Sequence, residues 1–431
     1  MANSAVGAIF GFTFWIIAAR RVSSYDIGLA SAMLAASSLI VTLSRLGMDA
    51  GLIRYLPGAK NGNELYFSIQ VVTLVTSLVF SLIYFIGINL FSPSLSFIIN
   101  SWVLPVFIIY GIITSLASIQ STGLIALREG NLNLICNIVL GLRIPAIILL
   151  TSFGIMGVLS SYVIAYCLSI IIGSYFLRRL GFVKYVFSFK WIKDTLNFSL
   201  GNYTADIFAI APNTIVPIMI INTLGAVQNA YFYIAFTIAT LLFMIPLSVS
   251  ISLFVEGSHN VPLRESTLKS IKFSLMLLLP IVLFIFLFGG QILMIYNKEY
   301  AVQSFQILKF LALASIFQVL PCIYISIKKV TRDIRTLNAL NLASSVLLIC
   351  AGYVSLLKYG LIGMGYTWLG LNIAMSIAVI VLAIKWDKMI VFRASDLIAF
   401  VPGKNFISAC ISKMVNLISG LSSGLLSWLP F

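Results

Sequence analysis

Residues 132–177 read LNLICNIVLGLRIPAIILLTSFGIMGVLSSYVIAYCLSIIIGSYFL and contain one charged side chain, Arg143. About 20 apolar residues suffice to cross the hydrocarbon core of a bilayer as an α-helix. This run is about twice that length, and Gly154 lies near its middle. The stretch therefore predicts two successive transmembrane helices, over 132–151 and 155–177, joined by a short turn.

The composition of the whole chain agrees with this local pattern. Of its 431 residues, 61% are hydrophobic and 9% are charged, whereas a soluble domain carries about 25% charged residues. The apolar runs lack the alternation of a transmembrane β-strand, so they favour helices, which satisfy their own backbone hydrogen bonds in lipid. We expect an all-α polytopic membrane protein. No basic region precedes the first apolar stretch, so we interpret it as a span rather than as a cleaved signal peptide.

The apolar runs between polar breaks number about twelve, six in each half of the chain. The first six are expected at 3–19, 28–47, 65–90, 100–127, 132–151 and 155–177, and the others at 197–221, 228–255, 270–296, 304–327, 336–356 and 360–384. This predicts an N-terminal six-helix lobe (1–180), a cytoplasmic connector (181–196) and a C-terminal six-helix lobe (197–385). Residues 386–431 form a cytoplasmic or interfacial tail, in which 405–431 either lies in the interface or adds a helix.

The basic residues predict how the chain is oriented in the membrane. The formal net charge is +15, and most of the bases fall in the even-numbered connections and the tail. Because Lys and Arg are enriched in cytoplasmic loops, we expect both termini in the cytoplasm of a cell membrane. The bases are spread over short loops rather than over one folded face, so no nucleic-acid partner is expected.

The two halves resemble each other at an offset of about 202 to 206 residues, as in duplicated transporters. Phe153-Gly154-Ile155-Met156-Gly157 aligns with Tyr359-Gly360-Leu361-Ile362-Gly363 at this offset, and Asn137 aligns with Asn341. An even number of spans in each repeat preserves the orientation of the repeat. The halves are therefore predicted to be parallel repeats related by an axis along the membrane normal.

Signatures of enzymes and of metal sites are missing from the sequence. There is no GxxxxGK[ST] loop and no HExxH. The five cysteines lie in apolar segments without a C-x-x-C pair, and the one histidine, His259, lies in a polar loop. We therefore expect a protein that moves a substrate, not an enzyme, with no cofactor other than a coupling Na⁺ or H⁺ ion.

Arginines in or beside the spans are the candidate binding residues, because an ionised side chain at mid-membrane costs roughly 3 kcal/mol or more. Arg143 either contacts an anion in a cavity or is a structural arginine paired with Asn137 or a carbonyl. Arg20 and Arg21 end the first span on the side with few bases. They either extend to the membrane surface or bind phosphate bidentately.

Arg45 and Arg54 flank Gly47 and Gly51 at the predicted cytoplasmic end of the second span. Such a position is typical of ordinary topology charges. A contact with an anionic ligand is the alternative for this pair.

Asp206 is the one acid well inside a predicted span, and Pro212 and Pro217 interrupt its helix. A carboxylate in a broken helix can bind Na⁺ or H⁺ and so couple transport to a gradient, and the alternative is a counter-ion for an arginine. Neutral oxygens from Asn341 and Thr367, and from Asn338 and Asn372, are candidate ligands for the same cation.

Two segments carry a family resemblance. ARRV at 19–22, continuing to Gly28 and Leu29, and LGMDAGLIRYLP at 46–57 resemble the opening of polysaccharide and O-antigen flippases. These belong to the multidrug/oligosaccharidyl-lipid/polysaccharide exporter superfamily. Ser24 stands where this family commonly has a proline. Elsewhere the resemblance rests on the number of spans and on the repeat.

The resemblance implies a V-shaped pair of six-helix lobes around a cavity that alternates between the two sides of the membrane. It implies a flippase for isoprenoid-pyrophosphate-linked oligosaccharide in surface polysaccharide biosynthesis, working in membrane lipid and alongside polysaccharide assembly enzymes. Cavity cations of such proteins receive the pyrophosphate, a role that would fall to Arg20, Arg21, Arg54 and Arg143 here.

Two other functions remain open. A multidrug cation antiporter of the same superfamily would need an acidic cavity, and the first six predicted spans contain no buried acid. A membrane glycan polymerase or ligase would need a large outward loop, and the predicted outer connections are short.

Overall fold

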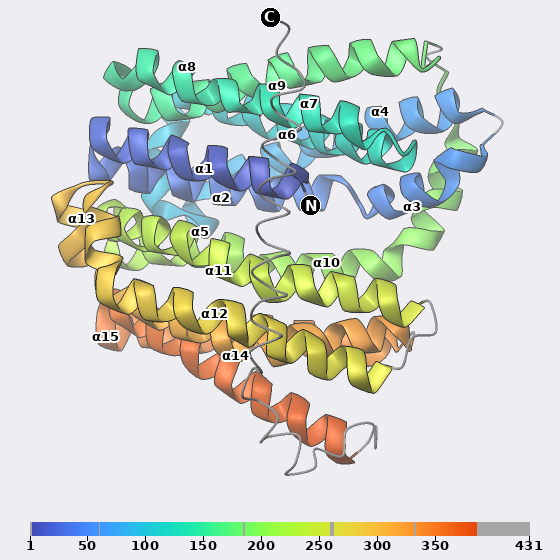
Figure 1. Cartoon of the computed structure of the whole chain (residues 1–431). Coiled ribbons are helices and arrows are strands. Elements are labelled where there is room, and N and C mark those ends of the chain that lie inside the picture. Colours follow the sequence, from blue (N-terminus) through green and yellow to red (C-terminus); the bar gives the residue numbers. More distant parts are fainter. Residues whose placement is uncertain (1, 60, 184–185, 259–262, 332, 386–431) are drawn as a thin grey trace, which may run out of the picture. The chain divides into compact units, whose positions relative to one another are not determined.

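Figure 1 shows the computed structural model of the chain, which describes residues 2–59, 61–183, 186–258, 263–331 and 333–385. Met1–Val379 form one compact unit. The chain from Ile380 onward forms a second unit, of which only the residues up to 385 are described. The predicted tail, 386–431, lies outside the described residues.

The first half of the chain folds into long helices with short ones between them. The long elements are α1 (Ala2–Arg21), α2 (Ser24–Ser44), α4 (Gly62–Ile86), α6 (Val103–Ala126), α7 (Gly130–Val139) with α8 (Arg143–Leu150), and α9 (Gly154–Arg179). The short ones are α3 (Met48–Tyr55), η1 (Leu56–Gly58), α5 (Ile88–Phe91), η2 (Pro93–Asn100), η3 (Leu140–Leu142) and η4 (Thr151–Phe153). The turn η3 joins α7 to α8 within one predicted span.

The second half contains α10 (Phe189–Leu224), α11 (Ala226–Ser258), α12 (Leu263–Met294), α13 (Lys298–Gln303), α14 (Phe305–Val330) and α15 (Ile334–Lys385). Helix α10 begins at Phe189, so the second half of the predicted connector is helical. Nine helical segments of the described residues are long and apolar enough to cross a membrane. The all-helical, polytopic fold class is thus confirmed.

Two of those nine segments, 130–179 and 335–384, are each 50 residues long, and each contains a glycine with positive φ. Gly154 has φ 53° and Gly360 has φ 62°. A side chain there would be strained, because the Cβ of an L-residue clashes with its own backbone in this region. A Cβ added three residues later, at Gly157 or at Gly363, would collide with the carbonyl oxygen of Leu150 or of Ser355. The chain therefore makes the same tight turn twice, 206 positions apart, in agreement with the aligned glycines of the sequence.

The outer helices carry large apolar side chains on the outside and small polar ones on the inside. On α4 the side chains of Ser68, Thr73, Ser77 and Ser81 are buried, whereas those of Val75, Leu78, Val79 and Leu82 are exposed. This arrangement reverses that of a water-soluble protein and suits a helix surrounded by lipid, where small residues allow close helix packing.

Helix α2 is the central helix of the compact unit. It contacts α4, α6 and α9 of its own half and α10 and α11 of the other, and it lies beside α1 in Figure 1. Its first turns approach α11 so closely that a Cβ on Gly28 would overlap the backbone of Ala226. The space between α2 and its neighbours is where the candidate site lies.

Candidate functional site

Three adjoining pockets lie around α2 within the compact unit. The polar pocket, about 370 Å³, lies between α2, α6, α7 and α9. The aromatic pocket, about 550 Å³, lies between α1, α2, α10 and α11. The Asp206 pocket, about 350 Å³, lies between the end of α2, α3 and α10. Ile210 lines all three pockets, and we refer to them together as the cavity.

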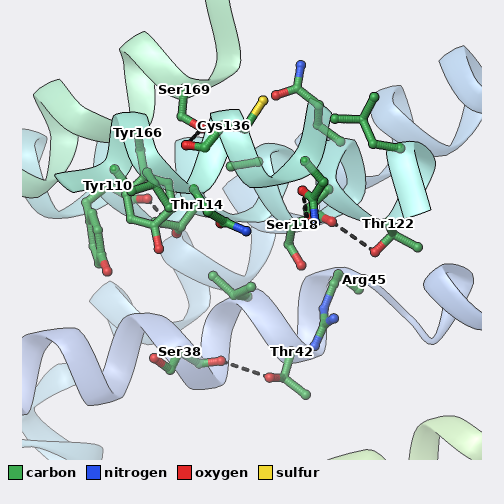
Figure 2. A pocket seen from close by; sticks show the side chains of 18 of the residues that line it. Ser38, Thr42, Arg45, Tyr110, Thr114, Ser118, Thr122, Cys136, Tyr166 and Ser169 are labelled. Carbon is green, nitrogen blue, oxygen red and sulfur yellow. Dashed lines mark hydrogen bonds between the residues drawn. The ribbon is translucent and has the colours of Figure 1, made fainter. Parts of the chain in front are cut away.

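The polar pocket is walled by hydroxyl and amide side chains (Figure 2). Its hydroxyl groups come from three helices, and several of them donate to backbone carbonyls. Thr42 donates to Ser38, Thr114 to Tyr110 and Ser169 to Cys136, at 2.7 to 3.1 Å. Their oxygen lone pairs remain available to a ligand, since a hydroxyl can accept as well as donate.

The aromatic pocket has a different wall. Trp15 and Tyr233 lie ring to ring with their centroids 4.8 Å apart, and Phe12, Tyr162 and Phe236 also line the space. Edge-to-face contacts of this kind fix the rings in place. The cavity is therefore hydrogen-bonding on one side and largely apolar on the other.

Arg143, the first residue of α8, contacts the wall of the aromatic pocket from behind and is not itself among the residues that line the three pockets. Its guanidinium carbon lies 5.0 Å from the ring centre of Tyr162 and 5.6 Å from that of Phe14. One of its nitrogens would lie 3.6 Å from a Cβ at Gly11, a residue of the aromatic pocket wall. Its Nε atom is buried without a hydrogen-bond partner. Within the part of the chain that the structure describes, no carboxylate pairs with this arginine.

Arg45 lies at the point where the polar pocket meets the Asp206 pocket and lines both. Its Nη1 atom lies 3.0 Å from the Asp49 carboxylate, and its Nε atom is buried without a partner. Asp206 lines the same pocket with an exposed side chain. The charges that act on Asp206 most strongly are those of Asp49, Arg45 and Lys329.

The other predicted cations lie elsewhere. Arg20 and Arg21 are exposed at the end of α1. The Nε atom of Arg20 donates to the carbonyl oxygen of Ile295, at 2.5 Å, and so joins α1 to the residue that follows α12. Arg54 is exposed on α3, with its guanidinium carbon 5.5 Å from the ring centre of Tyr55. Of the four predicted arginines, Arg143 is therefore the one that contacts a residue of the cavity wall.

The predicted cation ligands are not brought together. The walls of the Asp206 pocket include neither Asn341 nor Thr367. The Thr367 hydroxyl donates to the backbone carbonyl oxygen of Gly363 one turn earlier. The backbone carbonyl oxygen of Asn341 accepts a hydrogen bond from the Ser344 hydroxyl. The neutral oxygens that line the pocket with Asp206 come instead from Thr42 and Asn213.

Sequence reasoning treated Arg45 mainly as a topology charge, yet this residue lines two pockets. The missed signal was the opposite charge of Asp49, four residues later, which pairs with Arg45 across the turn between α2 and α3. The polar pocket was also missed. Its residues are distributed over four helices and look unremarkable in each of them.

Contacts between the two halves cluster at the end of the helices that the charge pattern places outside. Glu299 accepts hydrogen bonds from Ser24 and from Tyr231. Asn229 donates to the carbonyl oxygen of Gly28, at 2.8 Å. Helix α10 and η2 are also joined here, through Asn222, Ser94 and neighbouring carbonyls. This end of the cavity is therefore closed by direct contacts between the halves.

At the opposite end, α10 packs against the first half. The Tyr203 hydroxyl donates to the carbonyl oxygen of Leu43, at 2.9 Å. A Cβ on Gly51 would overlap the side chain of Thr195. These contacts anchor α10 beside the end of α2 and α3, next to the Asp206 pocket.

Comparison with known proteins gives the family of the chain. The profile of the polysaccharide biosynthesis protein family matches residues 2–254. The chain belongs to this family. A Shigella flexneri relative, named as a proposed O-antigen transporter, is 24% identical over 237 residues, which make up 52% of this polysaccharide biosynthesis protein. The matched region spans about half the length, 55%, of that curated relative.

Solved structures with the same fold include flippases and exporters. The lipid II flippase MurJ, in an inward closed conformation, has a TM-score of 0.70 at 15% identity, over 97% of this chain and 92% of that one. An inward-facing multidrug resistance MATE transporter of the MOP superfamily has a TM-score of 0.67 at 16% identity, over 89% and 95%. An outward-facing MATE structure has a TM-score of 0.56 at 16% identity, over 90% and 94%. This chain is a multi-pass membrane protein with the fold of these transporters.

Proposed function

We propose that this chain is a flippase that moves isoprenoid-pyrophosphate-linked oligosaccharide across the cytoplasmic membrane by alternating access, for surface polysaccharide biosynthesis. It would act in membrane lipid, with both termini in the cytoplasm, and would receive its substrate from polysaccharide assembly enzymes. The matched family and the O-antigen relative support this class of substrate.

Arg143 is the observation that carries the proposal. Its guanidinium lies against Tyr162, a residue of the aromatic pocket wall, and against Phe14, and it has no carboxylate partner among the described residues. A cation in such a place is costly unless water or an anionic ligand reaches it. A pyrophosphate can accept two parallel hydrogen bonds from one guanidinium. Arg45, held by Asp49, would be the second contact at the inner end.

Contacts between the halves occur at both ends of the cavity, and alternating access would break them in turn. The predicted outer end is joined by contacts that include Arg20 with Ile295 and Ser24 with Glu299. The chain also has a higher TM-score with the inward-facing MATE structure, 0.67, than with the outward-facing one, 0.56. Arg20 and Arg21 would then act at the outer gate, where the lipid leaves, rather than at the loading site.

Asp206 is the proposed coupling residue. It is an exposed carboxylate in a pocket that also contains Arg45 and Asp49. Protonation or binding of Na⁺ would change the net charge beside Arg45, and through it the affinity for pyrophosphate. Thr42 and Asn213 would supply neutral oxygens in place of Asn341 and Thr367.

A multidrug cation antiporter is the second candidate, and Asp206 is the observation that favours it. A cationic drug could pair with this carboxylate. The other cavity acid, Asp49, is already paired with Arg45 at 3.0 Å, which leaves fewer negative charges for a cation. A glycan polymerase or ligase has no comparable support, and we propose that the chain is not an enzyme.

The test is surface glycan in cells that lack the native gene and carry Arg143→Ala, Arg45→Ala or the control Arg179→Ala. Arg179 is an exposed arginine at the end of α9, beside Tyr175 and away from the cavity walls. We expect at least a tenfold loss of glycan for the two cavity variants and little change for the control, with equal amounts of protein in the membrane. Normal glycan in both cavity variants would contradict the proposal.

A further inference from the structure

The polar pocket differs from the rest of the cavity in what its wall can offer a ligand. The protons of Ser38, Thr42, Thr114 and Ser169 are already committed to carbonyl oxygens, and that of Ser121 to the side-chain oxygen of Asn133. The hydrogen-bonding capacity that these hydroxyls still offer a ligand is therefore that of their oxygen lone pairs, which accept. A wall rich in acceptors binds a ligand that donates many hydrogen bonds.

The wall also carries donors. The Asn137 amide and the hydroxyls of Ser118, Tyr110 and Tyr166 line the pocket and form no side-chain hydrogen bond within the described part of the chain. Gln120, by contrast, has its amide group committed to the carbonyl oxygen of Ile170 and to Ser174. The pocket thus presents both acceptors and uncommitted donors.

Arg45 is the one charged side chain in the wall of this pocket, and it lies at the end shared with the Asp206 pocket. A phosphate or carboxylate placed deeper would be buried without a second cation to pair with, which is costly. Acyl chains would leave the wall unsatisfied. The ligand that matches is uncharged and carries hydroxyl groups, which both donate and accept.

We infer that the polar pocket is a subsite for the uncharged sugars of the transported lipid, with the pyrophosphate held at its rim by Arg45. This inference rests on the proposed function and adds to it the class of sugar and its place. The subsite lies between α2, α6, α7 and α9 of the first half, and Ile210 of α10 lines it from the second half. Its hydroxyl and amide groups all belong to the first half, so they can keep the sugar bound while the second half moves.

The experiment measures binding to the full-length protein in lipid nanodiscs with two probes. One is farnesyl pyrophosphate, and the other is farnesyl pyrophosphate linked to a disaccharide of N-acetylglucosamine. The wild type should bind the sugar-bearing probe at least tenfold more tightly, because several hydrogen bonds of ordinary strength are added. Equal affinity for the two probes would overturn the subsite and leave the proposed function standing. Failure to bind either probe would overturn both.

The variants are Ser118→Ala and Asn137→Ala, alone and combined, with Asn131→Ala as the matched control. Asn131 lies on the same helix, α7, with an exposed side chain outside the pocket wall. The double variant should lose about tenfold in affinity for the sugar-bearing probe, as expected for two hydrogen bonds, and nothing for farnesyl pyrophosphate. The inference would be overturned if the double variant bound the sugar-bearing probe with unchanged affinity. It would also be overturned if the double variant folded but lost the same affinity for both probes. The wild-type comparison needs no variant and so decides the case even where a variant does not fold.

A third probe tests the restriction to uncharged sugars. It carries one hexuronic acid in place of an N-acetylglucosamine. We expect the wild type to bind it at least tenfold less tightly than the neutral probe, since the carboxylate would be buried without a second cation to pair with. Equal binding of the acidic and neutral probes would overturn the restriction.

Discussion

Ser24 donates a hydrogen bond of 2.9 Å to the carboxylate of Glu299, although the two residues lie 275 positions apart in the chain. Tyr231 donates to the other oxygen of the same carboxylate. One acidic side chain on the short helix α13 thus connects the start of α2 with the second half. In an alternating-access protein such a contact must break each time the outer end opens.

Removing that contact should open the predicted outer end. We expect Glu299→Ala to lengthen the distance between spin labels at Tyr25 and Val302, two exposed positions beside Ser24 and Glu299. Glu299→Gln should have a smaller effect because its amide oxygen still accepts. Glu64→Ala is the control, since Glu64 accepts only a local bond, from Asn61. An unchanged distance between the two labels in Glu299→Ala would show that the contacts of Glu299 do not hold the outer end closed.

Most of the fold could be predicted from the sequence because each span carries its own signal. A run of about 20 apolar residues predicts a transmembrane helix without reference to the rest of the chain. Helix α6 was predicted at 100–127 and occupies Val103–Ala126. Connections such as α3 and the start of α10 carry no such signal, because tertiary packing decides whether they are helical.

The site could be predicted only in part. Arg143 stood out because it is the one charge in a long apolar run. Arg20 has the same residue type and a similar setting in sequence, but it donates to the carbonyl oxygen of Ile295 across the two halves. Which arginine borders a cavity depends on how helices from both halves meet, and no single span contains that information.

The repeated tight turn makes a prediction about stability. Gly157→Ala and Gly363→Ala should each destabilise the protein by about 1–3 kcal/mol, the usual cost of overpacking, because the new methyl group meets a backbone carbonyl. Gly370→Ala has open space around it and should be neutral or stabilising by up to about 1 kcal/mol. Thermal unfolding in detergent would measure the difference. Equal melting temperatures for all three variants would contradict the close approach.

Asp206→Asn tests ion coupling. We expect the neutral side chain to slow transport driven by a Na⁺ or H⁺ gradient at least tenfold. Substrate binding without a gradient should persist. Asp194→Asn is the control, because Asp194 lies on the same helix with an exposed side chain outside the Asp206 pocket. Gradient dependence equal to that of the wild type would assign Asp206 a structural role.

Asp333 makes a prediction about pH. It caps α15, accepting from the Thr336 hydroxyl at 2.7 Å and from the Thr336 backbone amide at 3.2 Å. These bonds, with a smaller contribution from Lys328, lower the pKa of the Asp333 carboxyl below its ordinary value. The ordinary pKa of an Asp carboxyl is about 4. The cap therefore stabilises the fold fully above about pH 4, and this stabilisation is lost as the pH falls through the lowered pKa of Asp333.

Asp333→Ala should accordingly lower the free energy of unfolding at pH 7 by about 1 kcal/mol, a typical cost of losing such a cap. The difference from the wild type should shrink as the pH falls below 4. Thermal unfolding at a series of pH values would show this convergence. If the difference in stability between the wild type and Asp333→Ala stays constant down to the lowest pH, the charge of the Asp333 carboxylate contributes nothing to the stability of the fold.

Translocation by the purified protein in proteoliposomes tests the central claim most directly. The substrate is a fluorescent isoprenoid-pyrophosphate-linked oligosaccharide, and its arrival in the other leaflet is followed by quenching. The account predicts movement by the wild type, at least a tenfold slower rate for Arg143→Ala, and a rate close to that of the wild type for Arg179→Ala. Export of a cationic dye with no movement of the pyrophosphate-linked lipid would contradict it.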